Sequence, residues 1–183
     1  AGQTDGTITI AATEEDVVTS ATGALSAGGA IQVTSGDDMT FGDSITSINA
    51  GVTFNAGGDV TTLAGATVSA VDTSGGGAGT GFSTVTADGC VTPAATDTVA
   101  HGNTVTANDN ITVNANLVAD SDGGNDGDLT LTADADSSSA GDVVMAATVE
   151  ATADDIVIEG YNVAVDELLA DWAGTVGGGA AQD

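Results

Sequence analysis

The sequence predicts an all-β fold, a β-solenoid of about six to seven irregular coils. Three observations support this prediction. Short segments alternate apolar residues with Thr, Asn or Gln, which is the period-two pattern of half-buried strands. The segments recur at intervals of roughly 20–25 residues, the length of a solenoid coil with two or three strands. Pairs of Gly, Asp, Asn and Ser residues separate them, and these residues favour tight turns.

Seven segments carry the clearest alternation and are expected to form the main strand of successive coils. They are residues 7–12, 30–35, 51–56, 83–88, 104–109, 128–133 and 155–160. Further short strands are expected at 16–21, 38–42, 44–50, 59–64, 66–71, 110–115 and 142–147. The glycine-rich residues 74–81 are expected to form a loop inserted into one coil. A β-sandwich array is the alternative, because it also produces short alternating strands.

The two ends of the chain differ from the repeats. A strand that starts at residue 7 leaves no room for a capping helix before it, so we expect an open first edge. We assign residues 1–165 to the solenoid and residues 166–183 to a C-terminal cap or docking segment with a flexible tail. A short amphipathic helix or a final docking strand fits the apolar residues Val163, Val165, Leu168, Leu169 and Trp172. An open edge and a distinct tail favour head-to-tail stacking of copies.

The charge of the chain excludes several classes of partner. It contains no Lys or Arg and 27 Asp and Glu residues, which gives a formal net charge of -27. Without fixed cations the surface cannot hold phosphate backbones or anionic lipid headgroups, so we expect no nucleic acid partner and no binding to membrane surfaces. Insertion into a membrane is not expected either, because no apolar run approaches the roughly 20 residues that a spanning helix needs. Trypsin-like proteases find no cleavage site, which favours an extracellular or cell-surface location.

The acidic residues fall mostly at turns, where they also cap backbone N–H groups. Because a large negative charge opposes close packing, we expect dissolved cations to assist, and Ca²⁺ prefers several carboxylate and carbonyl oxygens. The most acidic loop is the candidate structural Ca²⁺ site, although it matches neither an EF-hand nor the calcium-binding nonapeptide repeat. Its candidate ligands are Asp120, Asp122, Asn125, Asp126 and Asp128.

Catalytic chemistry finds little support, and we expect no enzyme activity and no catalytic cofactor. His101 is the only histidine and lies in an expected turn, while Cys90, the only cysteine, is expected to be a small buried hydrophobic residue. No G-x-S-x-G nucleophile elbow is present. A polysaccharide hydrolase of the β-helix type would use two carboxylates, but one Trp and one Tyr offer few platforms for sugar rings.

Threonine dominates the expected outward positions of the main strands. The T-x-T pairs are Thr7 and Thr9, Thr84 and Thr86, Thr104 and Thr106, and Thr130 and Thr132. This pattern resembles the ice-binding faces of some small solenoids, but Gln32, Asn55, Val157 and Glu159 interrupt it. Threonine is also a favourable residue for any exposed strand face, which is the favoured interpretation. Glycans are a further expected partner class, since the hydroxyls and the sequon Asn110-Ile111-Thr112 are formal attachment sites.

The tandem units resemble the repeats of a known class of proteins. They are GTITIAA (6–12), GGDVTTLAGATV (57–68), GNTVTANDNITVNA (102–115) and GDLTLTADADSSSAGDVVMAA (127–147). These units, within residues 6–165, are similar to the repeats of large secreted bacterial β-helix exoproteins, the filamentous-haemagglutinin-like adhesins among them. The resemblance implies a right-handed β-helix, secretion, and an adhesive or fibre-forming role.

We therefore expect an extracellular structural protein, a subunit of a self-assembling, protease-resistant filament or surface matrix. Its partners are expected to be further copies of itself, stacked head to tail, and divalent cations. The alternative is an adhesin or ligand-binding fragment of a larger secreted β-helix exoprotein. The two hypotheses differ in whether the purified chain polymerises alone.

Overall fold

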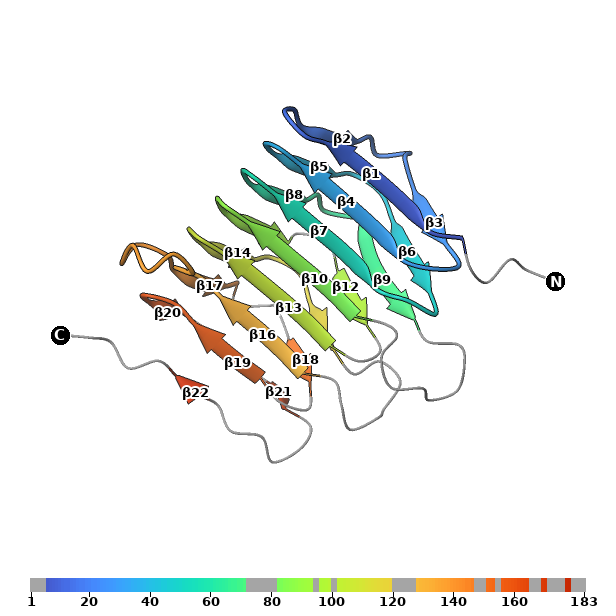
Figure 1. The fold of residues 1–183 in the computed structure, drawn as a ribbon. Helices are drawn as coiled ribbons and strands as arrows, with labels where there is room; N and C mark the ends of the chain where they lie inside the picture. The colour runs from blue at the N-terminus through green and yellow to red at the C-terminus, as the bar shows by residue number, and fades with distance from the viewer. Residues whose placement is uncertain are drawn as a thin grey trace.

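The structure is a computed structural model that describes residues 6–71, 82–93, 96–99, 102–119, 128–146, 151–153, 156–164, 169–170 and 177–178. Within these residues every regular element is a β-strand. Three parallel sheets, here called A, B and C, wind around a common core as a β-solenoid (Figure 1). The fold class expected from the sequence is thus confirmed. Among the described residues no helix is long and apolar enough to cross a membrane.

Each sheet runs the length of the solenoid, with β1–β3 at one end and β19–β22 at the other (Figure 1). In the described residues, sheet A contains eight strands, β1 (Ile8–Ala12), β4 (Ile31–Ser35), β7 (Val52–Ala56), β10 (Phe82–Ala87), β13 (Gly102–Ala107), β16 (Asp128–Thr132), β19 (Ile156–Glu159) and β22 (Gly177–Gly178). Sheet B contains seven, β2 (Val17–Thr19), β5 (Met39–Phe41), β8 (Val60–Thr62), β11 (Val91–Pro93), β14 (Ile111–Val113), β17 (Val143–Met145) and β20 (Val163–Ala164). Sheet C also contains seven, β3 (Leu25–Ala27), β6 (Ile45–Ile48), β9 (Thr67–Val71), β12 (Thr96–Val99), β15 (Leu117–Val118), β18 (Ala151–Ala153) and β21 (Leu169–Ala170).

One coil consists of a strand from sheet A, then one from sheet B, then one from sheet C. The described strands form seven complete coils, and β22 adds the first strand of an eighth, slightly more than the six to seven coils expected. Equivalent residues of successive coils pair in parallel, so that Ile10 lies beside Val33 and Val33 beside Phe54. A β-sandwich is built from antiparallel sheets. The parallel pairing therefore excludes the sandwich alternative.

The core consists of columns of inward side chains contributed by all three sheets. Alternation along each strand produces these columns, as in β4, where Ile31 and Val33 are buried while Gln32 and Thr34 are exposed. Phe41 and Phe54, from adjacent coils, stack with their ring centroids 4.4 Å apart. Burying one large apolar side chain stabilises the fold by about 1.5–3 kcal/mol. An aromatic pair adds about 0.5–1.5 kcal/mol beyond its buried area.

The corner between sheets A and B has no room for a side chain at several positions, among them Gly36 and Gly57. A Cβ atom on Gly36 would overlap the backbone of Thr13, and one on Gly57 would overlap the carbonyl oxygen of Gly36. The N–H of Gly57 donates to the carbonyl of Ser35 in the preceding coil at 3.1 Å. At Gly36 and Gly57 the adjacent coils therefore approach each other too closely for a larger residue.

The strands that alternate clearly were predictable, and the shortest ones were not. All seven expected main segments overlap a strand of sheet A, although β10 and β13 begin one and two residues earlier than expected. The sequence did not indicate β3, β11, β12, β15 or β18, which have only two to four residues each. In the expected C-terminal segment the structure describes two short strands, β21 and β22, which pair with β18 and β19 of the same chain. The expected loop at 74–81 and the boundary between residues 165 and 166 lie outside the described residues.

Candidate functional site

The turns from sheet A to sheet B gather a large share of the negative charge of the molecule. We call this line of turns the acidic ridge. It contains eleven of the described acidic residues, Glu14, Glu15, Asp16, Asp37, Asp38, Asp59, Asp88, Asp109, Asp134, Asp136 and Asp142. Because equivalent turns stack coil upon coil, carboxylates far apart in the sequence lie in one line along the solenoid.

A ladder of side-chain hydrogen bonds connects the turns of the ridge. It involves the residue immediately before each strand of sheet B: Asp16, Asp38, Asp59, Cys90, Asn110, Asp142 and Asn162. The backbone N–H of Asp38 donates to Oδ1 of Asp16 at 3.2 Å, and that of Asp59 donates to Oδ1 of Asp38 at 2.8 Å. The N–H of Cys90 donates to Oδ1 of Asp59 at 2.7 Å. Each carboxylate thus binds the backbone of the next coil.

In the fourth coil the ladder residue is a cysteine and not Asp or Asn. Cys90 presents a thiol where the neighbouring coils present a carboxylate or an amide, and Nδ2 of Asn110 lies 3.9 Å from its Sγ. The oxygen pattern then resumes, since the N–H of Asp142 donates to Oδ1 of Asn110 at 2.9 Å. Nδ2 of Asn162 donates to Oδ1 of Asp142 at 2.8 Å. Because sulfur is a weak acceptor, Cys90 is the weakest step of the described ladder.

The first two coils bring three acidic side chains of the ridge together. Asp16, Asp37 and Asp38 are exposed, and one carboxylate oxygen from each lies within 4.8 Å of the others. A carboxylate offers about four lone-pair sites on two oxygens, so a single ladder bond leaves acceptor capacity on Asp16 and Asp38. The chain has no Lys or Arg to neutralise the cluster. Oxygen donors of this kind suit a hard cation such as Ca²⁺.

The calcium ligands expected from the sequence lie elsewhere. Asp128 is exposed at the start of β16, where the chain enters sheet A from sheet C. Asp120, Asp122, Asn125 and Asp126 lie outside the described residues, as does His101. The metal site at this loop therefore stays a prediction.

One expectation about a single residue was wrong. Cys90 is partly exposed and not a buried hydrophobic residue, because it lies on the ridge and not on an inward strand position. The ladder itself was also missed. An Asp or Asn directly before Val, Ile or Met in successive repeats was the signal that could have indicated it.

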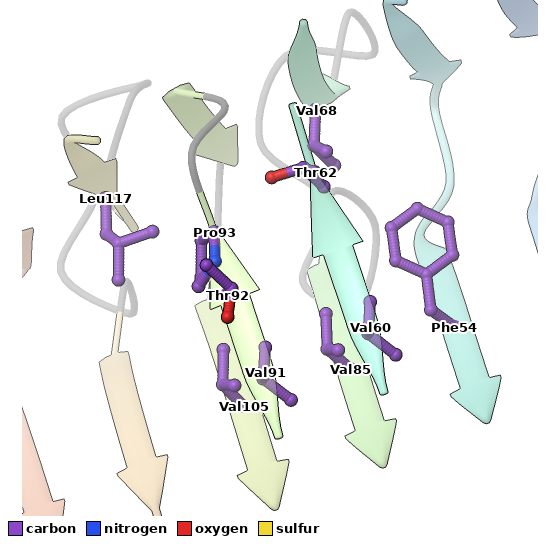
Figure 2. A pocket seen from close by; sticks show the side chains of 10 residues that line it. All are labelled: Phe54, Val60, Thr62, Val68, Val85, Val91, Thr92, Pro93, Val105 and Leu117. Carbon is purple, nitrogen blue, oxygen red and sulfur yellow. The ribbon is translucent and has the colours of Figure 1, made fainter. Parts of the chain in front are cut away.

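A small cavity among the described residues, shown in Figure 2, does not suit a substrate. Its volume is about 20 Å³, and Phe54, Val85, Val105 and Leu117 are among the side chains that line it. The lining is almost entirely apolar, and a space of this size admits at most a water molecule. It results from the smaller Val85 following Phe54 in the same column.

Comparison of the chain with protein-family models, with curated proteins and with solved structures gave no match. The β-helical character that the repeat pattern suggested is shown by the parallel coils themselves.

Proposed function

We propose that this chain is an extracellular structural protein whose solenoids stack head to tail into a protease-resistant filament or surface matrix. One observation carries the proposal. Within the described residues, β1, β2 and β3 pair with strands on one side only. The apolar columns of the core are partly exposed at this end, since Ile8, Ile10 and Leu25 are only half-buried. Their equivalents in the next coil, Ile31, Val33 and Ile45, are 0%, 1% and 1% exposed.

An open coil edge favours the addition of another coil. A row of unpaired backbone N–H and C=O groups is a template for strand pairing, and half-exposed isoleucine side chains gain stability when they are covered. At the opposite end, Tyr161 and Val163, in and next to the last strand of sheet B, are exposed large apolar residues. Both ends therefore offer apolar surface, and contact between two different ends generates an open filament.

Divalent cations are the proposed counterpart of the acidic ridge. Stacked copies with a net charge of -27 each repel one another. The cluster of Asp16, Asp37 and Asp38 lies in the first two coils, next to the open edge. A cation such as Ca²⁺ bound there would lower the repulsion at the point where the next copy docks. The cation is thus a structural component, and the proposal includes no catalytic cofactor and no enzyme activity.

Two features of the sequence support the extracellular setting. A chain without Lys or Arg offers trypsin-like proteases no site. The tandem units resemble those of filamentous-haemagglutinin-like exoproteins, and that resemblance implies secretion, a right-handed helix and a fibre-forming or adhesive role. These implications are part of the proposal.

Negative-stain electron microscopy of the purified chain in millimolar Ca²⁺, repeated after chelation, tests the proposal. We expect uniform filaments that shorten or disappear on chelation. Ile10→Asp, which places a charge on the open edge, is expected to abolish filaments. Circular dichroism should show that this variant is still folded. Thr9→Asp, the outward neighbour on β1, is the matched control and should still polymerise.

Compact single particles under both conditions would refute self-assembly and would favour the adhesin fragment of a larger exoprotein. Equal loss of filaments in Ile10→Asp and Thr9→Asp would refute the open edge as the contact. If chelation leaves the filaments unchanged, self-assembly would stand and the proposed role of the cation would be refuted.

A further inference from the structure

The outward face of sheet A carries an ordered set of threonines that structural stacking does not use. We call Thr84, Thr86, Thr104, Thr106, Thr130 and Thr132 the threonine array. The pairing register aligns Thr84, Thr104 and Thr130 in one column and Thr86, Thr106 and Thr132 in a second. Thr53 extends the first column by one coil, while Asn55 occupies the corresponding place in the second. Three consecutive coils thus present an uninterrupted T-x-T row each.

The array is regular in two directions. Neighbouring strands lie about 4.7–4.9 Å apart, and residues i and i+2 of one strand about 6.6–6.8 Å apart. Threonine is β-branched, so its χ1 angle is restricted and its hydroxyl and methyl groups repeat with the backbone. The strands of sheet A lie side by side and nearly parallel along the solenoid (Figure 1). The face therefore presents hydroxyl and methyl groups in a rigid two-dimensional pattern.

The face is also uncharged over most of its length. The outward positions of β1, β4, β7, β10 and β13 contain no acidic residue, although the chain has 27. Asp128 and Glu159 border the array in the last coils. A ligand for this face is therefore neutral, rigid and periodic on the same scale. Outward Thr53, Thr84, Thr86, Thr104 and Thr106 on β7, β10 and β13 present hydroxyl and methyl groups there.

We propose that the threonine array binds ice. The two repeats of the array are close to the spacings of oxygen atoms on a prism plane of hexagonal ice, so that hydroxyl groups of successive threonines meet successive lattice waters. The methyl groups between them exclude disordered water from the contact. This activity is independent of filament formation, because the array lies on the side of the solenoid and not at its open edge.

The test is to grow a single ice crystal in a solution of the full-length chain and measure thermal hysteresis and crystal faceting. We expect both for the unmodified chain. Thr104→Tyr, at the centre of the array, is expected to remove them, and Thr130→Tyr serves as a second variant if the first does not fold. Thr61→Tyr, on the outward face of sheet B, is the matched control and should behave as the unmodified chain.

The absence of hysteresis and faceting for the unmodified chain would overturn the proposal. So would equal losses in Thr104→Tyr and Thr61→Tyr, since the effect would then not belong to this face. Co-sedimentation with cellulose or chitin particles in the same buffers tests whether the chain binds a neutral polysaccharide instead. Binding there without any effect on ice would assign the face to a neutral polysaccharide and refute ice binding.

Discussion

Replacing Cys90 with asparagine is expected to stabilise the solenoid by repairing its side-chain ladder. Every other described ladder position is Asp or Asn, and each accepting Oδ1 lies 2.7–3.2 Å from the nitrogen that donates to it. An asparagine at position 90 would offer a carbonyl oxygen to the backbone N–H of Asn110, as Asp59 does to Cys90. One added hydrogen bond of this kind contributes about 0.5–1.5 kcal/mol.

Equilibrium unfolding in urea measures this effect, as a rise in the midpoint at constant slope. Cys90→Ser is the control, because its shorter side chain removes the thiol without reaching the next coil. Asp59→Ala is expected to lower the midpoint, since the N–H of Cys90 loses its acceptor, while Asp59→Asn keeps that acceptor and should be tolerated. If Cys90→Asn were no more stable than Cys90→Ser, the ladder would not be a source of stability and the reasoning would fail.

Three further predictions concern the core, the corner and the cation cluster. Phe54→Ala removes a fully buried ring and its stack with Phe41, and should cost about 3–5 kcal/mol by urea unfolding. The control Thr53→Ala on the same strand should stay within about 0.5 kcal/mol, and a similar loss in both would contradict the assigned alternation. Gly57→Ala should lower the melting temperature strongly, because its Cβ meets the Gly36 carbonyl, whereas Gly6→Ala meets open space and should not. Ca²⁺ should raise the melting temperature by preferential binding to the folded chain, and Asp38→Asn should reduce that rise more than Asp43→Asn. Asp43→Asn removes the same charge, but Asp43 lies outside the cluster of three. An equal reduction by both substitutions would indicate general screening of charge instead of binding at the cluster.

The sequence predicted the parts of the fold that depend on alternation within one strand. β4 and β7 each alternate buried and exposed residues over five positions, and both were expected within one residue of their bounds. β15 has only two residues, so nothing in its own sequence distinguishes it from a turn. The ladder joins residues 20 to 32 positions apart, and it becomes visible only when the register between coils is known. The acidic turns were recognised as a group, but the stacking that lines them up required the structure.

Fibre diffraction from filaments aligned in Ca²⁺ tests head-to-tail stacking most directly. Strands in the solenoid run across its long axis (Figure 1), and neighbouring strands are about 4.7–4.9 Å apart. If copies continue the solenoid end to end, a reflection at about 4.8 Å lies on the meridian, along the filament axis. A reflection of that spacing on the equator would show that the solenoids lie across the filament and would contradict stacking through the open edge.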